Sequence, residues 1–333
     1  MKAAVYYSNS DLRIEDAPMP QIGPGELLVK IMASGICGTD VMEWYRIRKA
    51  GHILGHEIAG YVAEAGKGVT DYKQDDRVFV SHHVPCNECK YCAAGNHTAC
   101  STLHAGNYDP GGFCEFVRIP EINVKNGTYK LPESMRYEEG AMIEPLACVV
   151  RGQRVAHIRK GHTVLILGCG ISGLMNIQFA KYKGARVIAT DINLFRLEKA
   201  KSFGADQVIH ASKSLDGIKA DRIIVCTGAQ PAVDQAFQCM DRSGIILFFA
   251  IPKENFHVPV VDFWRNEWTL TTSYGAAPRD LEEALDLISN RTVNMMDLIT
   301  HRLPLDRIQE GFETAAAATG DSLKVVIFPH EMP

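Results

Sequence analysis

One stretch of the sequence decides the fold, residues 163–173, which read TVLILGCGISG. The opening TVLIL is apolar and partly β-branched, as in a strand that is buried on both faces of a sheet. The glycines that follow form a G-x-G-x-x-G, and a helical pattern then runs to Lys183 and ends at Gly184. A strand, a glycine-rich turn and a helix in this order predict one unit of a parallel α/β sheet.

The sequence on both sides of this unit repeats the alternation. From residue 146 onward, apolar strand-like runs and helical patterns take turns. The predicted strands of this region are 163–167, 186–190, 207–209, 222–225, 245–249 and 268–272. Strands that alternate with helices predict an α/β fold with a doubly wound parallel sheet.

The glycine loop predicts a dinucleotide-binding site. Gly168 would make the tight turn, Gly170 would let the backbone approach a pyrophosphate, and Gly173 would let the helix and the strand pack closely. Ile171 and Ser172 complete the loop, and the helix predicted from Gly173 to Lys183 would turn its free N–H groups and positive dipole end toward the phosphates.

Two charged residues extend this prediction. Asp191 ends the next predicted strand, where a carboxylate can bind the ribose hydroxyls and would repel a 2′-phosphate. This favours NAD over NADP, although the same residue could be a helix N-cap or a turn residue. Arg196 is a candidate to stack on the adenine, and the alternative is an ordinary charged residue on a helix surface.

The first 145 residues have a different pattern. Short strand-like runs at 27–32, 57–62 and 77–80 are separated by glycine and proline, which predicts a β-rich barrel or sandwich. Near the C-terminus, 281–288 has one apolar helical stripe, Ala315 to Ala318 reads as helix, and 323–328 reads as a final strand. We therefore expect a catalytic domain at 1–145, a dinucleotide-binding domain at 146–290 and a return of 291–333 to the first domain.

The composition limits the possible partners. The chain has 333 residues, 46% of them hydrophobic, with a net charge of −4 and no basic run, so nucleic acid and anionic membranes are not expected. The N-terminus has no signal-peptide pattern, and no apolar stretch is long enough to span a membrane. The expectation is a cytoplasmic protein.

A group of four cysteines predicts a metal site. Cys86, Cys89, Cys92 and Cys100 follow the spacing C-x2-C-x2-C-x7-C, and four thiolates at such a spacing can close around Zn²⁺. An iron–sulfur cluster is the competing interpretation, but its fourth cysteine usually comes sooner and before proline, whereas Ser101 follows here. With every zinc position filled by protein, the site would be structural.

Separate segments supply residues for a second metal site. Cys37 lies in GICGTD, His56 and Glu57 lie in GHE, and Glu144 lies in EPL. One thiolate, one imidazole and one carboxylate would leave a zinc coordination position open for water or substrate. The residues do not decide whether Glu57 or Glu144 is the carboxylate ligand.

Taken together, these motifs resemble those of the zinc-containing medium-chain dehydrogenases, over essentially the whole chain. GICGTD, GHE, the four-cysteine segment and the glycine loop occur in the family's order, and EPL at 144–146 resembles the polyol (sorbitol) branch. GICGTD is shared with threonine and butanediol dehydrogenases. The resemblance implies a GroES-like catalytic domain, a Rossmann domain and a homo-oligomer. It also implies that Cys37, His56 and either Glu57 or Glu144 bind a catalytic zinc ion.

The resemblance further implies a mechanism. Zinc would lower the pKa of a substrate hydroxyl, and hydride would pass to the nicotinamide. Thr39 occupies the position where the family's proton relay begins. A histidine often completes that relay, but Met42 stands at its position here, and His52 is a possible substitute or else a surface histidine.

The sequence therefore predicts a zinc- and NAD-dependent dehydrogenase. Its substrate would be a small polar secondary alcohol such as a polyol, a sugar alcohol or a cyclitol. An amino-alcohol dehydrogenase of the threonine or aminocyclitol type is the alternative. A non-catalytic NAD-binding protein on the same fold is a third possibility, which loss of Cys37 or His56 would have supported; both are present.

Overall fold

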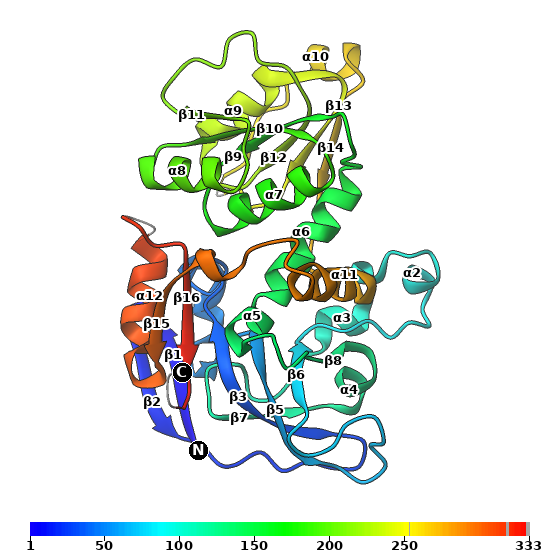
Figure 1. The fold of residues 1–333 in the computed structure, drawn as a ribbon, viewed down its shortest axis with the longest axis vertical. Coiled ribbons are helices and arrows are strands. Elements are labelled where there is room, and N and C mark those ends of the chain that lie inside the picture. The colour runs from blue at the N-terminus through cyan, green and yellow to red at the C-terminus, as the bar shows by residue number, and fades with distance from the viewer. Residues whose placement is uncertain (253, 318–319, 331–333) are drawn as a thin grey trace. The chain divides into compact units, whose positions relative to one another are not determined.

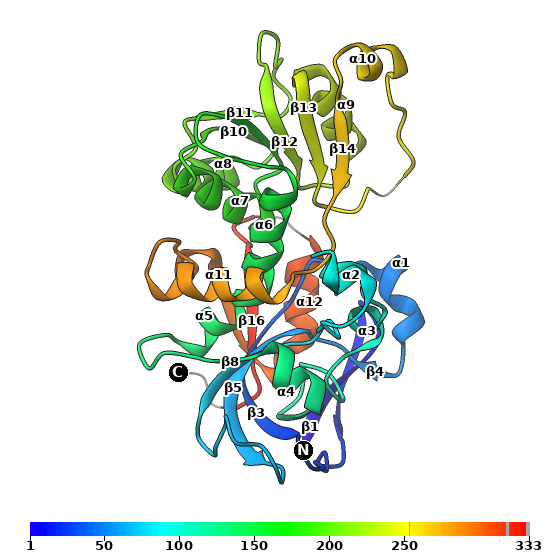
Figure 2. The same ribbon diagram turned by 90° about the vertical axis from the view of Figure 1, so that its right-hand side faces the viewer.

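The computed structural model describes residues 1–252, 254–317 and 320–330. The chain forms two compact units. The first consists of Met1–Ala147 and Ala276–Pro333, and the second of Cys148–Gly275. Figures 1 and 2 show β-strands in both. Helix α6 (Ile143–Val155) contains the point where the chain passes from the first unit to the second.

The first unit is built on two sheets. One has the order β2-β1-β4, and the other has the order β15-β16-β3-β5-β6-β8, with β7 paired to β3. The smaller sheet contains β1 (Lys2–Ser8), β2 (Asp11–Asp16) and β4 (His52–Ile53). The larger contains β3 (Leu27–Gly35), β5 (Glu57–Ala65), β6 (Arg77–Ser81), β7 (Phe116–Ile119), β8 (Thr128–Lys130), β15 (Ile299–Pro304) and β16 (Lys324–Phe328). The apolar runs expected at 27–32, 57–62 and 77–80 thus lie in adjacent strands.

Short helices connect these strands. They are α1 (Glu43–Arg46), η1 (Ile47–Lys49), α2 (Lys90–Ala93), η2 (His97–Ala99), α3 (Ser101–Ala105), α4 (Glu121–Gly127), α5 (Tyr137–Ala141), α11 (Pro278–Ser289), η3 (Met296–Leu298), η4 (Leu305–Arg307) and α12 (Ile308–Ala317). The core between the strands includes Val29, Ile31, Ile58 and Val80, all fully buried. These side chains alternate along their strands, so one face of each strand is apolar.

The second unit is a parallel sheet covered by helices. Its strand order is β11-β10-β9-β12-β13-β14, with all neighbours parallel. The strands are β9 (Thr163–Leu167), β10 (Arg186–Asp191), β11 (Gln207–His210), β12 (Ala220–Val225), β13 (Met240–Phe248) and β14 (Thr269–Thr272), and the helices are α7 (Ile171–Tyr182), α8 (Leu194–Ser202), α9 (Gln230–Cys239) and α10 (Val260–Arg265). Helices α7 and α8 lie on one face and α9 on the other (Figures 1 and 2). The predicted doubly wound sheet is confirmed.

The return to the first unit comes earlier than expected. We expected it at residue 291, but it begins at Ala276 and includes helix α11. The physical reason is that this helix has its contacts there: the Tyr129 hydroxyl donates to the carbonyl oxygen of Pro278 (3.4 Å), and Arg291, just beyond the helix, pairs with buried Glu139. Its apolar stripe predicts a helix but not which core the helix covers. The expected helix at Ala315 extends to Ala317, and Ala318 lies outside the described residues.

No helix in the described ranges is long and apolar enough to cross a membrane.

Candidate functional site

Three expected metal ligands meet at one end of strands β3 and β5. Cys37 follows the end of β3, His56 precedes β5, and Glu57 begins it. Antiparallel pairing sets Gly35 opposite Glu57, which brings the two chain segments together. The donor atoms of Cys37, His56 and Glu57 lie within 4.8 Å of one another. A thiolate, an imidazole and a carboxylate at this spacing fit the donor set of a zinc site with an open position.

Glu57 is also held from the opposite direction by a buried cation. Lys324 is the first residue of β16. Its ammonium group forms an ion pair with Oε2 of Glu57 and donates a second hydrogen bond to the Ile36 carbonyl oxygen (3.0 Å). Both side chains are at most 2% exposed. Burial acts to lower the pKa of Lys324, but the charges of Glu57 and Cys37 outweigh it and raise this pKa above its usual value.

The ion pair between Lys324 and Glu57 needs a glycine at position 35. A Cβ at Gly35 would lie 2.1 Å from Oε2 of Glu57 and 2.9 Å from Cε of Lys324. The other carboxylate oxygen of Glu57, Oε1, is buried and has no hydrogen-bond partner within the described part of the chain. A buried acceptor without a partner is costly, so this oxygen is available to a cation.

A second buried carboxylate organises the other ligands. Asp40 accepts a hydrogen bond from the Cys37 backbone N–H (3.1 Å), and its Oδ1 lies 3.4 Å from Nδ1 of His56. Burial would lower the pKa of His56, but Asp40 and Cys37 outweigh it and raise this pKa well above its usual value. A carboxylate on one ring nitrogen fixes the tautomer, which leaves Nε2 as the atom able to bind a metal.

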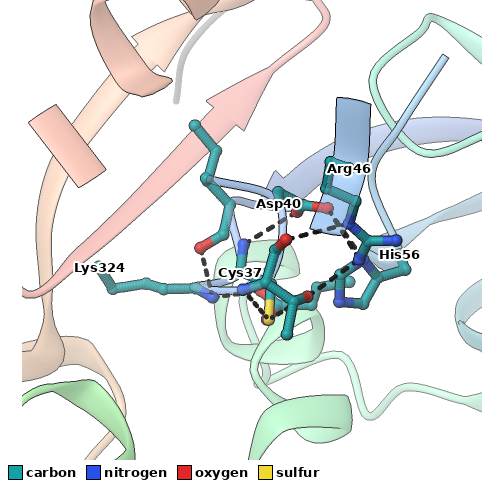
Figure 3. Close-up of polar contacts among 8 residues, drawn as sticks. Cys37, Asp40, Arg46, His56 and Lys324 are labelled. Carbon is teal, nitrogen blue, oxygen red and sulfur yellow. Dashed lines mark hydrogen bonds and ion pairs between the residues drawn. The ribbon is translucent and has the colours of Figure 1, made fainter. Parts of the chain in front are cut away.

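Arg46 lies against Thr39, a contact that the sequence analysis did not foresee. Its Nε donates to the Thr39 carbonyl oxygen and its Nη2 to the Thr39 hydroxyl, both at 3.0 Å. The Thr39 hydroxyl in turn donates to Sγ of Cys37 (3.3 Å). In Figure 3, Arg46 and His56 lie on one side of Cys37 and Lys324 lies on the other. The sequence signal for Arg46 was weak, because an arginine in a short charged segment is usually a solvated surface residue.

Two further histidine rings lie next to His56. The His82 ring, just after β6, lies 4.8 Å from the His56 ring and 3.8 Å from the His83 ring. Burial and neighbouring positive groups lower the pKa of His82 well below its usual value and that of His83 to about 4. Both rings are therefore neutral near pH 7. Sequence reasoning missed them, although their position directly after a predicted strand was a usable signal.

The other predicted catalytic residues are not among the three converging ligands. Glu144 is buried on α6, and its charge contributes, after burial, to a raised pKa of the fully buried Tyr108. It is not among the three residues whose donor atoms converge. Met42 precedes α1, while His52 is exposed on β4, with its Nδ1 3.4 Å from the Ala50 carbonyl oxygen. Neither side chain forms a hydrogen bond with Thr39 in the described part of the chain.

The four cysteines of the second predicted site also converge. Donor atoms of Cys86, Cys89, Cys92 and Cys100 lie within 4.8 Å of one another, around helix α2. The apolar cluster beneath them contains only Leu103 besides the cysteines themselves. A lobe with so little apolar core needs another source of stability, and a closed four-thiolate set fits a structural zinc ion.

The glycine loop has the geometry that a dinucleotide site needs. Gly168 has φ of +96°, which only glycine adopts readily. A Cβ at Gly173 would lie 1.9 Å from the Gly168 carbonyl oxygen, whereas one at Gly170 would meet nothing within 4 Å. Ile171 and Ser172 form the first turn of α7. The loop therefore has open space at Gly170, at the positive end of the helix.

Asp191 fastens this loop to the next strand. Its Oδ2 accepts a hydrogen bond from the Cys169 backbone N–H (2.6 Å) and its Oδ1 accepts one from Asn193 N–H (2.8 Å). Arg196 lies in the first turn of α8, where its own N–H is capped by the side chain of Asn193 (3.3 Å). The carboxylate thus has a structural role, and each oxygen keeps room for one further hydrogen bond.

Comparison with known proteins agrees with both units. Residues 23–133 match the family described as "Alcohol dehydrogenase GroES-like domain", and residues 172–290 match "Zinc-binding dehydrogenase". The chain is 33% identical to sorbitol dehydrogenase of Mus musculus, over 97% of this chain and 94% of that protein.

Solved structures give the same result. The 2R,3R-butanediol dehydrogenase from Bacillus subtilis is 26% identical with a TM-score of 0.86, covering 99% of each chain. Galactitol-1-phosphate dehydrogenase from Escherichia coli is also 26% identical, with a TM-score of 0.86 over 99% of this chain and 100% of that one.

Proposed function

Because this chain belongs to the zinc-containing medium-chain alcohol dehydrogenases, we propose that it oxidises a secondary alcohol of a small polar substrate, with NAD as the hydride acceptor. The alcohol would be a polyol, a sugar alcohol or a cyclitol. The observation that carries the proposal is the convergence of donor atoms from Cys37, His56 and Glu57 within 4.8 Å.

These three residues would hold the catalytic zinc ion. Support for Glu57 as the carboxylate ligand comes from its unpartnered Oε1, since Lys324 engages only Oε2. Glu144 remains a candidate for exchange with Glu57, because it is buried on the helix that enters the second unit. When bound, the zinc ion supplies Lewis-acid stabilisation of the substrate oxygen, and NAD supplies the hydride acceptor.

The protein's own groups would orient the substrate and handle its proton. The Thr39 hydroxyl lies 3.3 Å from Sγ of Cys37, so it can accept a hydrogen bond from a hydroxyl placed at the open zinc position. Onward transfer to Arg46 is excluded, because a guanidinium group has no acceptor. Asp40 keeps His56 in the ligand tautomer, and Lys324 limits how far the Glu57 carboxylate can turn.

The cofactor would be held by the second unit. Gly168, Gly170 and Gly173 provide the turn, the open backbone and the close packing that a pyrophosphate site requires. Asp191 would bind the ribose hydroxyls and disfavour a 2′-phosphate, and Arg196, which lies in the first turn of the following helix, would contact the adenine. The four-cysteine lobe would hold a second, structural zinc ion, and we expect a homo-oligomer.

Of the alternatives, the amino-alcohol substrate has less support. An ammonium group would need a carboxylate at the site, but Asp40 is already surrounded by Arg46, His56 and the Cys37 N–H. The permanent charge of Arg46 beside Thr39 would repel a second cation. A non-catalytic dinucleotide-binding protein would not need Cys37 and His56 to converge with Glu57.

A combined metal and activity measurement tests the proposal. We expect two zinc ions per chain, and reduction of NAD with several neutral polyols, cyclitols or butane-2,3-diol. Dialysis against a chelator should abolish turnover, and added zinc should restore it. Turnover of amino alcohols alone, or full activity in a protein without zinc, would contradict the proposal.

A further inference from the structure

Arg46 uses only one edge of its guanidinium group inside the protein. Nε and Nη2 donate to the carbonyl and hydroxyl oxygens of Thr39, and Nη2 also lies 3.4 Å from Oδ1 of Asp40. A guanidinium group has five N–H donors, of which two belong to Nη1. Among the residues that the structure describes, none accepts a hydrogen bond from Nη1. The two N–H donors of Arg46 Nη1 are therefore available to an acceptor.

Arg46 is also the more accessible member of its pair with Asp40. The Arg46 side chain is 19% exposed, whereas its partner Asp40 is 1% exposed. Asp40 is further committed to His56 and to the Cys37 N–H. The negative member of the pair is thus buried, and the positive member is the one that solvent reaches.

Arg46 lies close to the atoms that would react. Its Nη2 is 3.0 Å from Oγ1 of Thr39, which is 3.3 Å from Sγ of Cys37. With a Zn–S distance of about 2.3 Å, the guanidinium group is at most about 9 Å from the metal position. A small substrate with its hydroxyl at the zinc ion can span this distance with a few carbon atoms.

The segment that carries Arg46 is cationic, although the chain as a whole is negative. Residues 43–49, EWYRIRK, carry three cations and one acid, against a net charge of −4 for the chain. Of these cations, Arg46 is the one that contacts Thr39 and Asp40, and its charge persists across the physiological pH range.

We propose that Arg46 is a specificity-determining residue that binds an oxyanion of the substrate, so that this enzyme prefers alcohols carrying a carboxylate or a phosphate a few carbons from the oxidised hydroxyl. The inference rests on the proposed alcohol dehydrogenase function and narrows its substrate class. The shared chemistry is a charge-assisted hydrogen bond from the unengaged Nη1 donors of Arg46 to an oxyanion acceptor.

Matched alcohols that differ in charge test this inference. Two sets are suitable: glucitol, gluconate and glucitol 6-phosphate, and glycerol, glycerate and glycerol 3-phosphate. We expect the wild-type protein to favour an anionic member of a set by about tenfold or more in kcat/KM, mainly through KM, since charge-assisted hydrogen bonds contribute about this much. Whether the carboxylate or the phosphate member gains more identifies the source of the oxyanion.

Substitution of Arg46 then tests whether its side chain causes the preference for anionic alcohols. In Arg46→Gln, the ratio of anionic to neutral kcat/KM should fall by roughly tenfold to hundredfold. The ratio is the readout, because a purely structural loss of the Thr39 contact would reduce both rates alike. Arg48→Gln is the matched control: the guanidinium carbons of Arg46 and Arg48 both lie 5.0 Å from the Tyr45 ring centre, but Arg48 is exposed and has no contact with Thr39.

The outcomes separate the two proposals. Oxidation of neutral polyols without any preference for the anionic members would overturn the role of Arg46 and leave the proposed function standing. A preference that survives Arg46→Gln would overturn it as well. If no alcohol of either charge reduces NAD, the proposed function itself fails.

Discussion

Lys324 and Glu57 form a buried ion pair across 267 residues of sequence, and this pair joins the last strand of the chain to the candidate metal site. Strands β16 and β5 flank β3 on its two sides, and the Lys324 and Glu57 side chains meet beside the end of β3, where Gly35 has no side chain to separate them. The C-terminal segment therefore takes part in holding the ligand carboxylate in place.

Removing the cation should destabilise the first unit. In Lys324→Met, the Glu57 carboxylate would be buried without its partner, and the metal-free protein should lose about 3–5 kcal/mol of its free energy of unfolding. The double variant with Glu57→Gln should recover part of this loss, because no charge then remains buried. Urea unfolding measures both values. Lys125→Met, which breaks the exposed pair with Glu121, is the control and should change little; an equally small effect at Lys324 would contradict the buried pair.

Two glycines of the dinucleotide loop should respond differently to alanine. Gly173→Ala should lower thermal stability, because its Cβ would collide with the Gly168 carbonyl oxygen. Gly170→Ala should fold with near-normal stability, since its Cβ meets no atom of the protein, yet it should bind NADH more weakly because the methyl group takes the space of the pyrophosphate. Thermal unfolding and titration of NADH fluorescence separate the two effects. Unchanged NADH affinity in Gly170→Ala would argue against this loop as the phosphate site.

The two metal sites should be separable by single substitutions. Cys37→Ala should reduce the zinc content from two ions per chain to one and abolish turnover, while NADH affinity stays nearly intact. The four-cysteine lobe is remote in sequence and should keep its ion. Metal analysis, activity and NADH titration on one sample test this; a fully active Cys37→Ala protein would show that the proposed metal chemistry is wrong.

Loss of the other zinc ion should affect structure before chemistry. In Cys89→Ser, residues 86–100 would lose one of four thiolates that close the lobe, and the apolar cluster there is too small to replace it. We expect rapid proteolysis within this segment or impaired assembly, measured by limited digestion and size-exclusion chromatography. A lobe that resists protease as well as the wild type would contradict a structural metal.

Asp191 should affect both the preference for NAD over NADP and the conformation of the glycine loop. Asp191→Ala removes the charge that would repel a 2′-phosphate, and it also removes the acceptor for the Cys169 N–H. The ratio of kcat/KM for NADP to that for NAD should therefore rise, while the value for NAD falls. Asp191→Asn keeps an acceptor oxygen and should lose less. An unchanged ratio in both variants would mean that Asp191 is only a structural residue of the turn.

Local pattern alone predicted a large part of this protein. The strand at 163–167, the glycine loop and the four-cysteine spacing each lie within a few residues, so the physical rules that govern them act on neighbouring positions. The stripe at Leu281, Ala284, Leu285 and Ile288 likewise predicted helix α11. It could not show that this helix belongs to the first unit, because an apolar stripe does not identify the surface that it covers.

The tertiary structure decided which side chains, distant in sequence, are buried next to one another. The sequence determined that Cys37, His56 and a carboxylate were available, but Glu57 and Glu144 could not be ranked from it. Packing of β16 against β3 brings Lys324 to one oxygen of Glu57, and the turn after Cys37 brings Arg46 to Thr39. Buried charges interact strongly over a few ångströms and negligibly along an extended chain. Their partners are therefore set by the fold, while the residue types and the local elements are set by the sequence.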